Sequence, residues 1–123
     1  MNGLKDSAKE KGQAFIDEWL KVLPQLEEMG FEITSFGVAM ALSPALEVEM
    51  KGKSDDFTDE RVAELMEANE SNNYVSLVLK SIRTTRSMHR KVHNNEPTAD
   101  IFLKITVKVP PEIRVYFGKP RLH

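Results

Sequence analysis

Residues 101–117 read IFLKITVKVPPEIRVYF, and this stretch decides the fold. Large apolar side chains occupy every second position on both sides of the adjacent prolines, a period of two that is typical of strands with one buried face. Proline cannot adopt the positive φ that the tightest hairpin turns need, so we expect a three-residue loop that pairs Val109 with Ile113. The stretch therefore predicts a β-hairpin with Lys108 opposite Arg114 on its outer face.

An earlier stretch, residues 36–50, has the same alternation in FGVAMALSPALEVEM. The proline in its middle again excludes a two-residue loop, so we expect a three-residue loop with Leu42 opposite Leu46. Met40 then lies opposite Val48, and the large residues share one face because register parity decides the face that each side chain takes. The other face of this second hairpin carries small side chains and two acids: Gly37, Ala39, Ala41, Glu47 and Glu49.

The two hairpins match each other at an offset of 67 residues, with their prolines aligned. A duplicated helix–hairpin unit would explain the match. The preceding helical segments do not align at this offset, because Trp19 would fall on Arg86 and Val22 on His89. Any amphipathic hairpin with a proline loop has this pattern, so duplication and coincidence both remain open.

Three further segments have the periodicity of amphipathic helices, at about residues 7–29, 59–70 and 74–93. In the first, Ser7 with Glu10 predicts a capping box, Pro24 predicts a kink, and Gly30 predicts the end. Thr58 is the expected N-cap of the second. In the third, steps of 100° place Val75, Val78, Ile82, Thr85, His89 and Val92 on one arc, and Lys80, Arg83, Arg86, Arg90 and Lys91 on the opposite side.

Together these elements predict one α+β domain over residues 1–123, with frayed ends at about 1–6 and 119–123. Its element order is α-ββ-α-α-ββ. We expect a four-stranded antiparallel sheet, built from the two hairpins, with the three helices packed mainly on one face. The order of the strands in that sheet is left open.

The composition excludes several classes of protein. Hydrophobic residues make up 41% and charged residues 29%, which is typical of globular domains. No apolar run approaches the ~20 residues that span a bilayer. There is no cysteine, so disulfides and thiolate chemistry are excluded and a cytoplasmic setting is expected. No glycine-rich phosphate loop or nucleophile elbow is present, so we expect a non-enzymatic protein without a cofactor.

Histidines 89 and 93 are one helical turn apart, a spacing that can place two zinc ligands on one helix face. No HExxH motif accompanies them, and His89 falls within the apolar arc. We therefore expect a partly buried histidine and no metal site.

Charge is divided unevenly along the chain. Residues 1–79 carry seven basic and sixteen acidic side chains, a net of −9, whereas residues 80–123 carry ten and three, a net of +7. One interpretation is neutralisation within the chain or between subunits, with the acidic helix beside the basic arc and Glu47 and Glu49 paired with Lys108 and Arg114. The other is nucleic-acid binding through Lys80, Arg83, Arg86, Arg90, Phe102, Lys104, Lys108, Arg114 and Tyr116.

The overall pI of about 5.9 favours neutralisation over a dedicated nucleic-acid binder. The leading hypothesis is a protein-interaction module that associates with itself or with a protein partner through the small-residue face of residues 37–41 and the neighbouring glutamates. Nucleic-acid binding is the alternative, and a domain that holds an apolar small ligand between sheet and helices is a further one.

Overall fold

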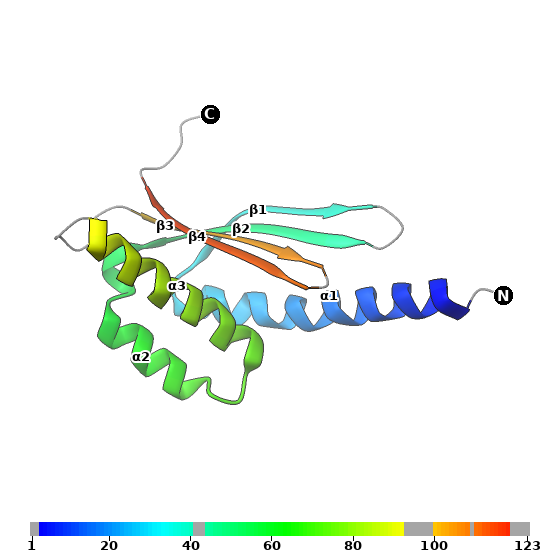
Figure 1. Cartoon of the computed structure of the whole chain (residues 1–123), viewed down its shortest axis with the longest axis horizontal. Helices are drawn as coiled ribbons and strands as arrows, with labels where there is room; N and C mark the ends of the chain where they lie inside the picture. Colours follow the sequence, from blue (N-terminus) through cyan, green and yellow to red (C-terminus); the bar gives the residue numbers. More distant parts are fainter. Residues whose placement is uncertain (1–2, 41–43, 93–99, 109, 119–123) are drawn as a thin grey trace.

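In this computed structural model the four strands form one antiparallel sheet in the order β1-β2-β3-β4 (Figure 1). The two inner strands, β2 (Ala45–Lys53) and β3 (Asp100–Val107), join the two hairpins side by side. The outer strands, β1 (Glu32–Ala39) and β4 (Glu112–Gly118), form the two edges. The hairpins therefore adjoin, and the sheet that the sequence predicts is confirmed.

Three helices complete the order α-ββ-α-α-ββ: α1 (Gly3–Met29), α2 (Asp59–Ala68) and α3 (Asn73–Val92). A single 3-10 turn, η1 (Ser54–Asp56), leads from β2 into α2. The structure describes residues 3–40, 44–92, 100–108 and 110–118. The helices lie on one side of the sheet and leave its other face open, as Figure 1 shows.

The core fills the space between this helical layer and the sheet. Helix α1 packs on β2 and β3, whereas α3 packs on β4. Trp19 of α1 is fully buried and contacts the ring of Tyr74 at the start of α3, with ring centroids 5.1 Å apart. Each large apolar side chain buried in this way stabilises the fold by about 1.5–3 kcal/mol. The helix-facing residues of the inner strands that are buried to 1% exposure or less are Leu46, Val48, Met50, Ile101, Leu103, Ile105 and Val107.

Both hairpins have longer loops than the sequence predicts. The last pair in the first hairpin is Ala39 with Ala45, and Val38 lies opposite Leu46, so the pairing of Leu42 with Leu46 is wrong. The predicted faces survive, because a shift of four residues preserves the parity that assigns side chains to faces. Parity therefore cannot choose between the two registers. Proline cannot choose either, because the longer loop also accommodates it.

The second hairpin has the same correction. Ile105 pairs with Ile113 and Lys104 with Arg114, so the predicted pairs of Val109 with Ile113 and of Lys108 with Arg114 are wrong.

The corrected registers of the two hairpins coincide at the offset of 67 residues. Val38 opposite Leu46 corresponds to Ile105 opposite Ile113. The helices also match better than the sequence indicates, because Arg86, which aligns with Trp19, is buried at 3% exposure. The second mismatched pair differs more, because Val22 is buried whereas His89, which aligns with it, is only half-buried.

Local signals at the helix ends are partly confirmed. Gly30 ends α1 with a φ of +123°, while its N–H donates to the carbonyl of Glu27 and the N–H of Phe31 donates to that of Leu26. Helix α1 begins at Gly3, so the capping box at Ser7 is wrong, and the helix continues through Pro24. For α2, Thr58 is the N-cap, as predicted, because its hydroxyl accepts a hydrogen bond from the N–H of Arg61 at 3.2 Å.

The inward face of α3 differs from the prediction. Arg86 is buried with the apolar residues, seven residues beyond the fully buried Leu79. Val92, which was expected to face inward, is 77% exposed. His89 is half-buried, as expected, and its ring packs edge-on against Phe117 of β4 with centroids 5.5 Å apart.

Candidate interaction surface

The open face of the sheet carries an aromatic pair flanked by charged residues. Phe102 of β3 and Tyr116 of β4 lie directly opposite each other and stack, with ring centroids 5.3 Å apart and planes 16° from parallel. Lys104 and Arg114 form the next pair along the same strands. A stacked cross-strand pair of this kind stabilises a sheet by itself.

Two basic residues of the second hairpin bind an acidic residue of the same hairpin. The guanidinium of Arg114 binds the carboxylate of Glu112 at 2.5 Å, and the ammonium of Lys108 lies 3.8 Å from the same group. The hydrogen bond from Arg114 is the main reason that the pKa of Glu112 is lowered. The predicted pairing of Glu47 and Glu49 with Lys108 and Arg114 is therefore wrong.

Both glutamates do lie on the open face of β2. Glu49 lies opposite Lys104 and Glu47 opposite Thr106. Two adjacent strands of this face thus carry acidic residues on β2 and basic residues on β3. The open face is mixed in charge, with no large field of one sign.

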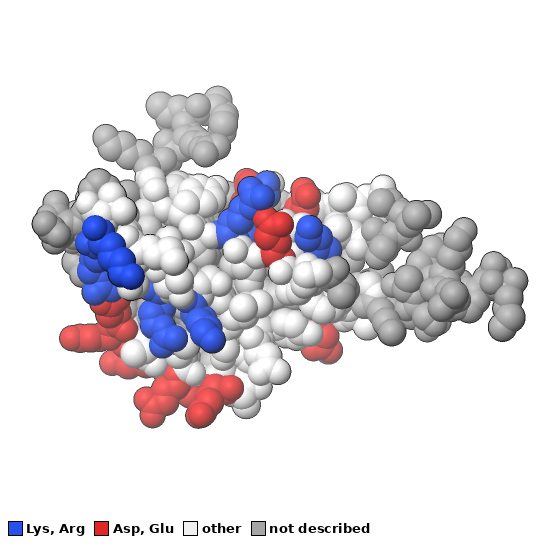
Figure 2. Space-filling view, viewed as in Figure 1, with Lys and Arg blue, Asp and Glu red and all other residues white. Residues whose placement is uncertain are grey.

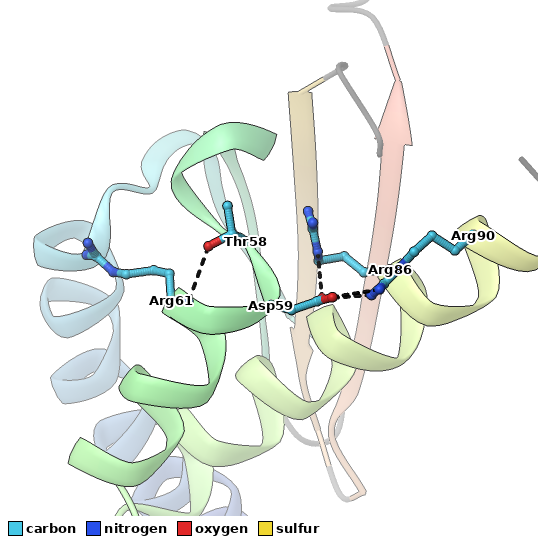
Figure 3. Close-up of polar contacts among 5 residues, drawn as sticks. All are labelled: Thr58, Asp59, Arg61, Arg86 and Arg90. Carbon is cyan, nitrogen blue, oxygen red and sulfur yellow. Dashed lines mark hydrogen bonds and ion pairs between the residues drawn. The ribbon is translucent and has the colours of Figure 1, made fainter. Parts of the chain in front are cut away.

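On the helical side, the acidic helix packs against the basic helix, as predicted. Asp59, in the first turn of α2, accepts hydrogen bonds from Nε of Arg86 at 3.3 Å and from Nη2 of Arg90 at 2.7 Å (Figure 3). Burial raises the pKa of Asp59, but the two arginines outweigh it, and the net pKa is lowered. Figure 2 shows basic side chains over α3 and acidic ones over α2 beside it. Charge is therefore neutralised within the chain at this helix pair.

This ion-pair cluster removes part of the predicted nucleic-acid footprint. Arg86 is 3% exposed and Arg90 is bound by Asp59, so neither presents a free cation to a phosphate. Lys80 and Arg83 are exposed on α3. They belong to the helical layer, whereas Phe102 and Tyr116 lie on the open face, so the two groups do not form one continuous surface.

The largest departure from the sequence analysis concerns the helix-facing side of β1. Phe36 and Val38 lie opposite the buried Val48 and Leu46, yet they are 55% and 51% exposed. Met40, directly after the strand, is 81% exposed. The helices cover β2, β3 and β4 but not this row, because α1 packs on β2 and β3. In Figure 1 the β1–β2 hairpin extends beyond the end of the β3–β4 hairpin.

The opposite side of β1 carries the small residues that the sequence singled out. Gly37 is half-buried and Ala39 is exposed on the open face, while Ala41 lies outside the described residues. We call the two sides together the β1 surface, made of Phe36, Val38 and Met40 on the helical side and Gly37 and Ala39 on the open side.

The two edge strands of the sheet differ in their protection. On β4 the helix-facing residues Ile113, Val115 and Phe117 pack against the core, and charged residues occupy the strand. On β1 no charged residue occurs from Ile33 onward, and the chain stays uncharged as far as Leu46. Proteins normally block an open edge with charges, prolines or a cover, because its free N–H and C=O groups accept another strand. The uncharged run is visible in the sequence, but the exposure of β1 is not, because it depends on which strands the helices cover.

The described residues form neither a metal-binding cluster nor a membrane-spanning helix. Within the described parts of the chain, no three acidic or histidine side chains gather closely enough to hold a metal ion, and His93 lies outside those parts. None of the described helices has the length and apolar character needed to cross a membrane. Comparisons with protein-family models, with curated proteins and with solved structures found no match.

Proposed function

We propose that this protein is a non-enzymatic protein-interaction module that binds another chain through the β1 surface. The observation that carries the proposal is an edge strand with an exposed apolar row and no charged residue after Glu32 at its start. A strand added to such an edge gains main-chain hydrogen bonds, and its alternate side chains reach the apolar row. The lack of cysteine supports a cytoplasmic setting for this module.

Three features support this function over catalysis. At the α2–α3 junction, Asp59 forms a cluster of ionised groups with Arg86 and Arg90. Because this cluster joins two helices, it has a structural role. On the surface of the second hairpin, Glu112 binds Lys108 and Arg114. By contrast, the apolar row of β1 contributes little to the core, so its exposure costs solubility without a gain in stability.

Site-specific photocrosslinking tests the proposal. A photoreactive phenylalanine analogue in place of Phe36 is irradiated in the presence of a cell extract and of the purified chain, and the adducts are mapped by mass spectrometry. Tyr116 is the matched control position, because it is an exposed aromatic residue on the other edge strand. We expect reproducible adducts at position 36 that map to defined peptides and are absent at position 116. A lack of adducts specific to position 36 would refute the proposal.

A second candidate function rests on the stacked Phe102 and Tyr116. Bases of single-stranded nucleic acid stack on aromatic side chains while lysine and arginine hold the phosphates, and Lys104 and Arg114 are the adjacent pair here. This function predicts binding of a fluorescent single-stranded oligonucleotide that weakens with salt and on Arg114→Ala. No change in fluorescence anisotropy at low ionic strength would exclude it.

A further inference from the structure

We infer that the chain bound at the β1 surface is a second copy of this protein, paired β1 to β1 in antiparallel orientation around a two-fold axis. The inference rests on the proposed function and names its partner. The two four-stranded sheets would then join into one continuous sheet of eight strands, with the helices of both copies on the same side.

The β1 surface is complementary to itself. Around a two-fold axis, when one residue of the first strand faces a second residue in the other copy, the reverse pair also forms. The helical sides of the two strands then adjoin, and so do their open sides. Phe36 and Val38 of one copy then extend the apolar row of the other on the helical side. On the open side Gly37 and Ala39 meet residues of the same small size, so no bulky or charged side chain opposes the pairing there.

Electrostatics do not oppose this pairing. Glu32, at the start of β1, is the only charged residue of the strand, and antiparallel pairing places the two copies of Glu32 at opposite ends. Glu47 and Glu49 lie on β2, three strand spacings from β2 of the second copy, or about 14 Å at ~4.8 Å per spacing. That separation exceeds the Debye length of about 8 Å at physiological ionic strength.

The area of the β1 surface indicates a weak association. At roughly 200 Å² for a large apolar side chain, the exposed parts of Phe36, Val38 and Met40 amount to roughly 350 Å² per copy. The small residues and the main-chain edge add to this. The total stays below the roughly 800 Å² per partner of a standard stable interface, so we expect dimers at high micromolar rather than nanomolar concentration.

The other edge strand is a poorer partner for β1. Pairing of β4 with β1 of a second copy would leave a free edge at each end and produce open chains of molecules. On β4 the apolar residues are already packed against the core, and Glu112 and Arg114 occupy its open side as a mutual ion pair. The strand therefore has no exposed apolar row to offer.

Spin labels distinguish the two-fold dimer from a head-to-tail chain. The protein has no cysteine, so Lys104→Cys and Arg114→Cys each provide a single labelling site, on directly opposite residues of β3 and β4. In the two-fold dimer, identical labels are separated by five strand spacings on β3 and seven on β4, at least about 24 and 34 Å. In a head-to-tail chain, both labels are separated by four spacings, about 19 Å.

We expect pulsed electron–electron dipolar spectra at high micromolar concentration to show the longer distance for the β4 label, by about 10 Å. Val38→Lys, added to each labelled chain, should remove both distances while the fluorescence of the single, buried Trp19 stays native. Equal short distances, or no intermolecular distance, would overturn the inference. In the second case, adducts of other proteins at position 36 would leave the proposed function standing, and their absence would remove it as well.

Discussion

Removal of the Asp59 carboxylate provides a quantitative test of how the helical layer is held together. Arg86 is 3% exposed, whereas the Asp59 side chain is 45% exposed. Loss of one partner from a fully buried ion pair costs about 3–5 kcal/mol, and an exposed pair contributes about 0–1 kcal/mol. The pair here is intermediate, so we expect Asp59→Ala to lower the free energy of unfolding by about 2 kcal/mol at neutral pH.

Glu60→Ala is the matched control for this substitution. Glu60 shares the first turn of α2 and its favourable interaction with the helix dipole, which contributes about 0.3–1 kcal/mol. Among the described residues it binds no arginine or lysine. Urea unfolding followed by the fluorescence of Trp19, at one protein concentration for all variants, measures the difference. Equal losses for Asp59→Ala and Glu60→Ala would refute the assignment of the ion pairs as a structural clamp.

Three further predictions concern the core, the pH dependence and the open face. Gly52→Ala should destabilise the protein by about 1–3 kcal/mol in the same assay, because a Cβ would lie 3.0 Å from ring carbons of two stacked, buried phenylalanines. Asp59 should contribute to the free energy of unfolding at pH values above its unfolded pKa of about 3.9, and this contribution should disappear as the pH falls through its lower folded pKa. Wild type and Asp59→Asn should therefore converge in stability in acid, and a constant difference would contradict this. A double-mutant cycle of Phe102→Ala and Tyr116→Ala should give a coupling of about 0.5–1.5 kcal/mol, and additivity would mean that the stacked pair does not stabilise the sheet.

The arrangement of elements was predictable because the hairpins follow strict alternation and the caps are local. Thr58 and Gly30 each act within one turn of their own position, so their roles follow from chemistry alone. Loop length was not predictable in this way. Registers that differ by four residues place every side chain on the same face, and the choice between them depends on contacts of the whole hairpin.

The candidate surface was predictable only in part. The sequence singled out Gly37 and Ala39, but it treated Phe36 and Val38 as core residues because their alternation is that of a buried face. Which strand the helices leave uncovered depends on the packing of α1 over β2 and β3, a tertiary property that periodicity does not contain. Arg86 is a different case, because steps of 100° place it within about 40° of Ile82 and in line with Leu79. The periodicity therefore predicts its burial, and its assignment to the basic side of the helix was wrong. The expectation of an apolar small ligand stays an untested prediction.

The mass in solution shows directly whether the β1 edge binds a second copy. Light scattering across a concentration series should show the wild-type mass rising from 14.0 kDa to a plateau at about 28 kDa, as expected for a closed two-fold dimer. Val38→Lys should remain at the monomer mass at every concentration, and Arg114→Ala on β4 should behave as wild type. A wild-type mass that stays at 14.0 kDa, or one that rises without a plateau, would contradict the account.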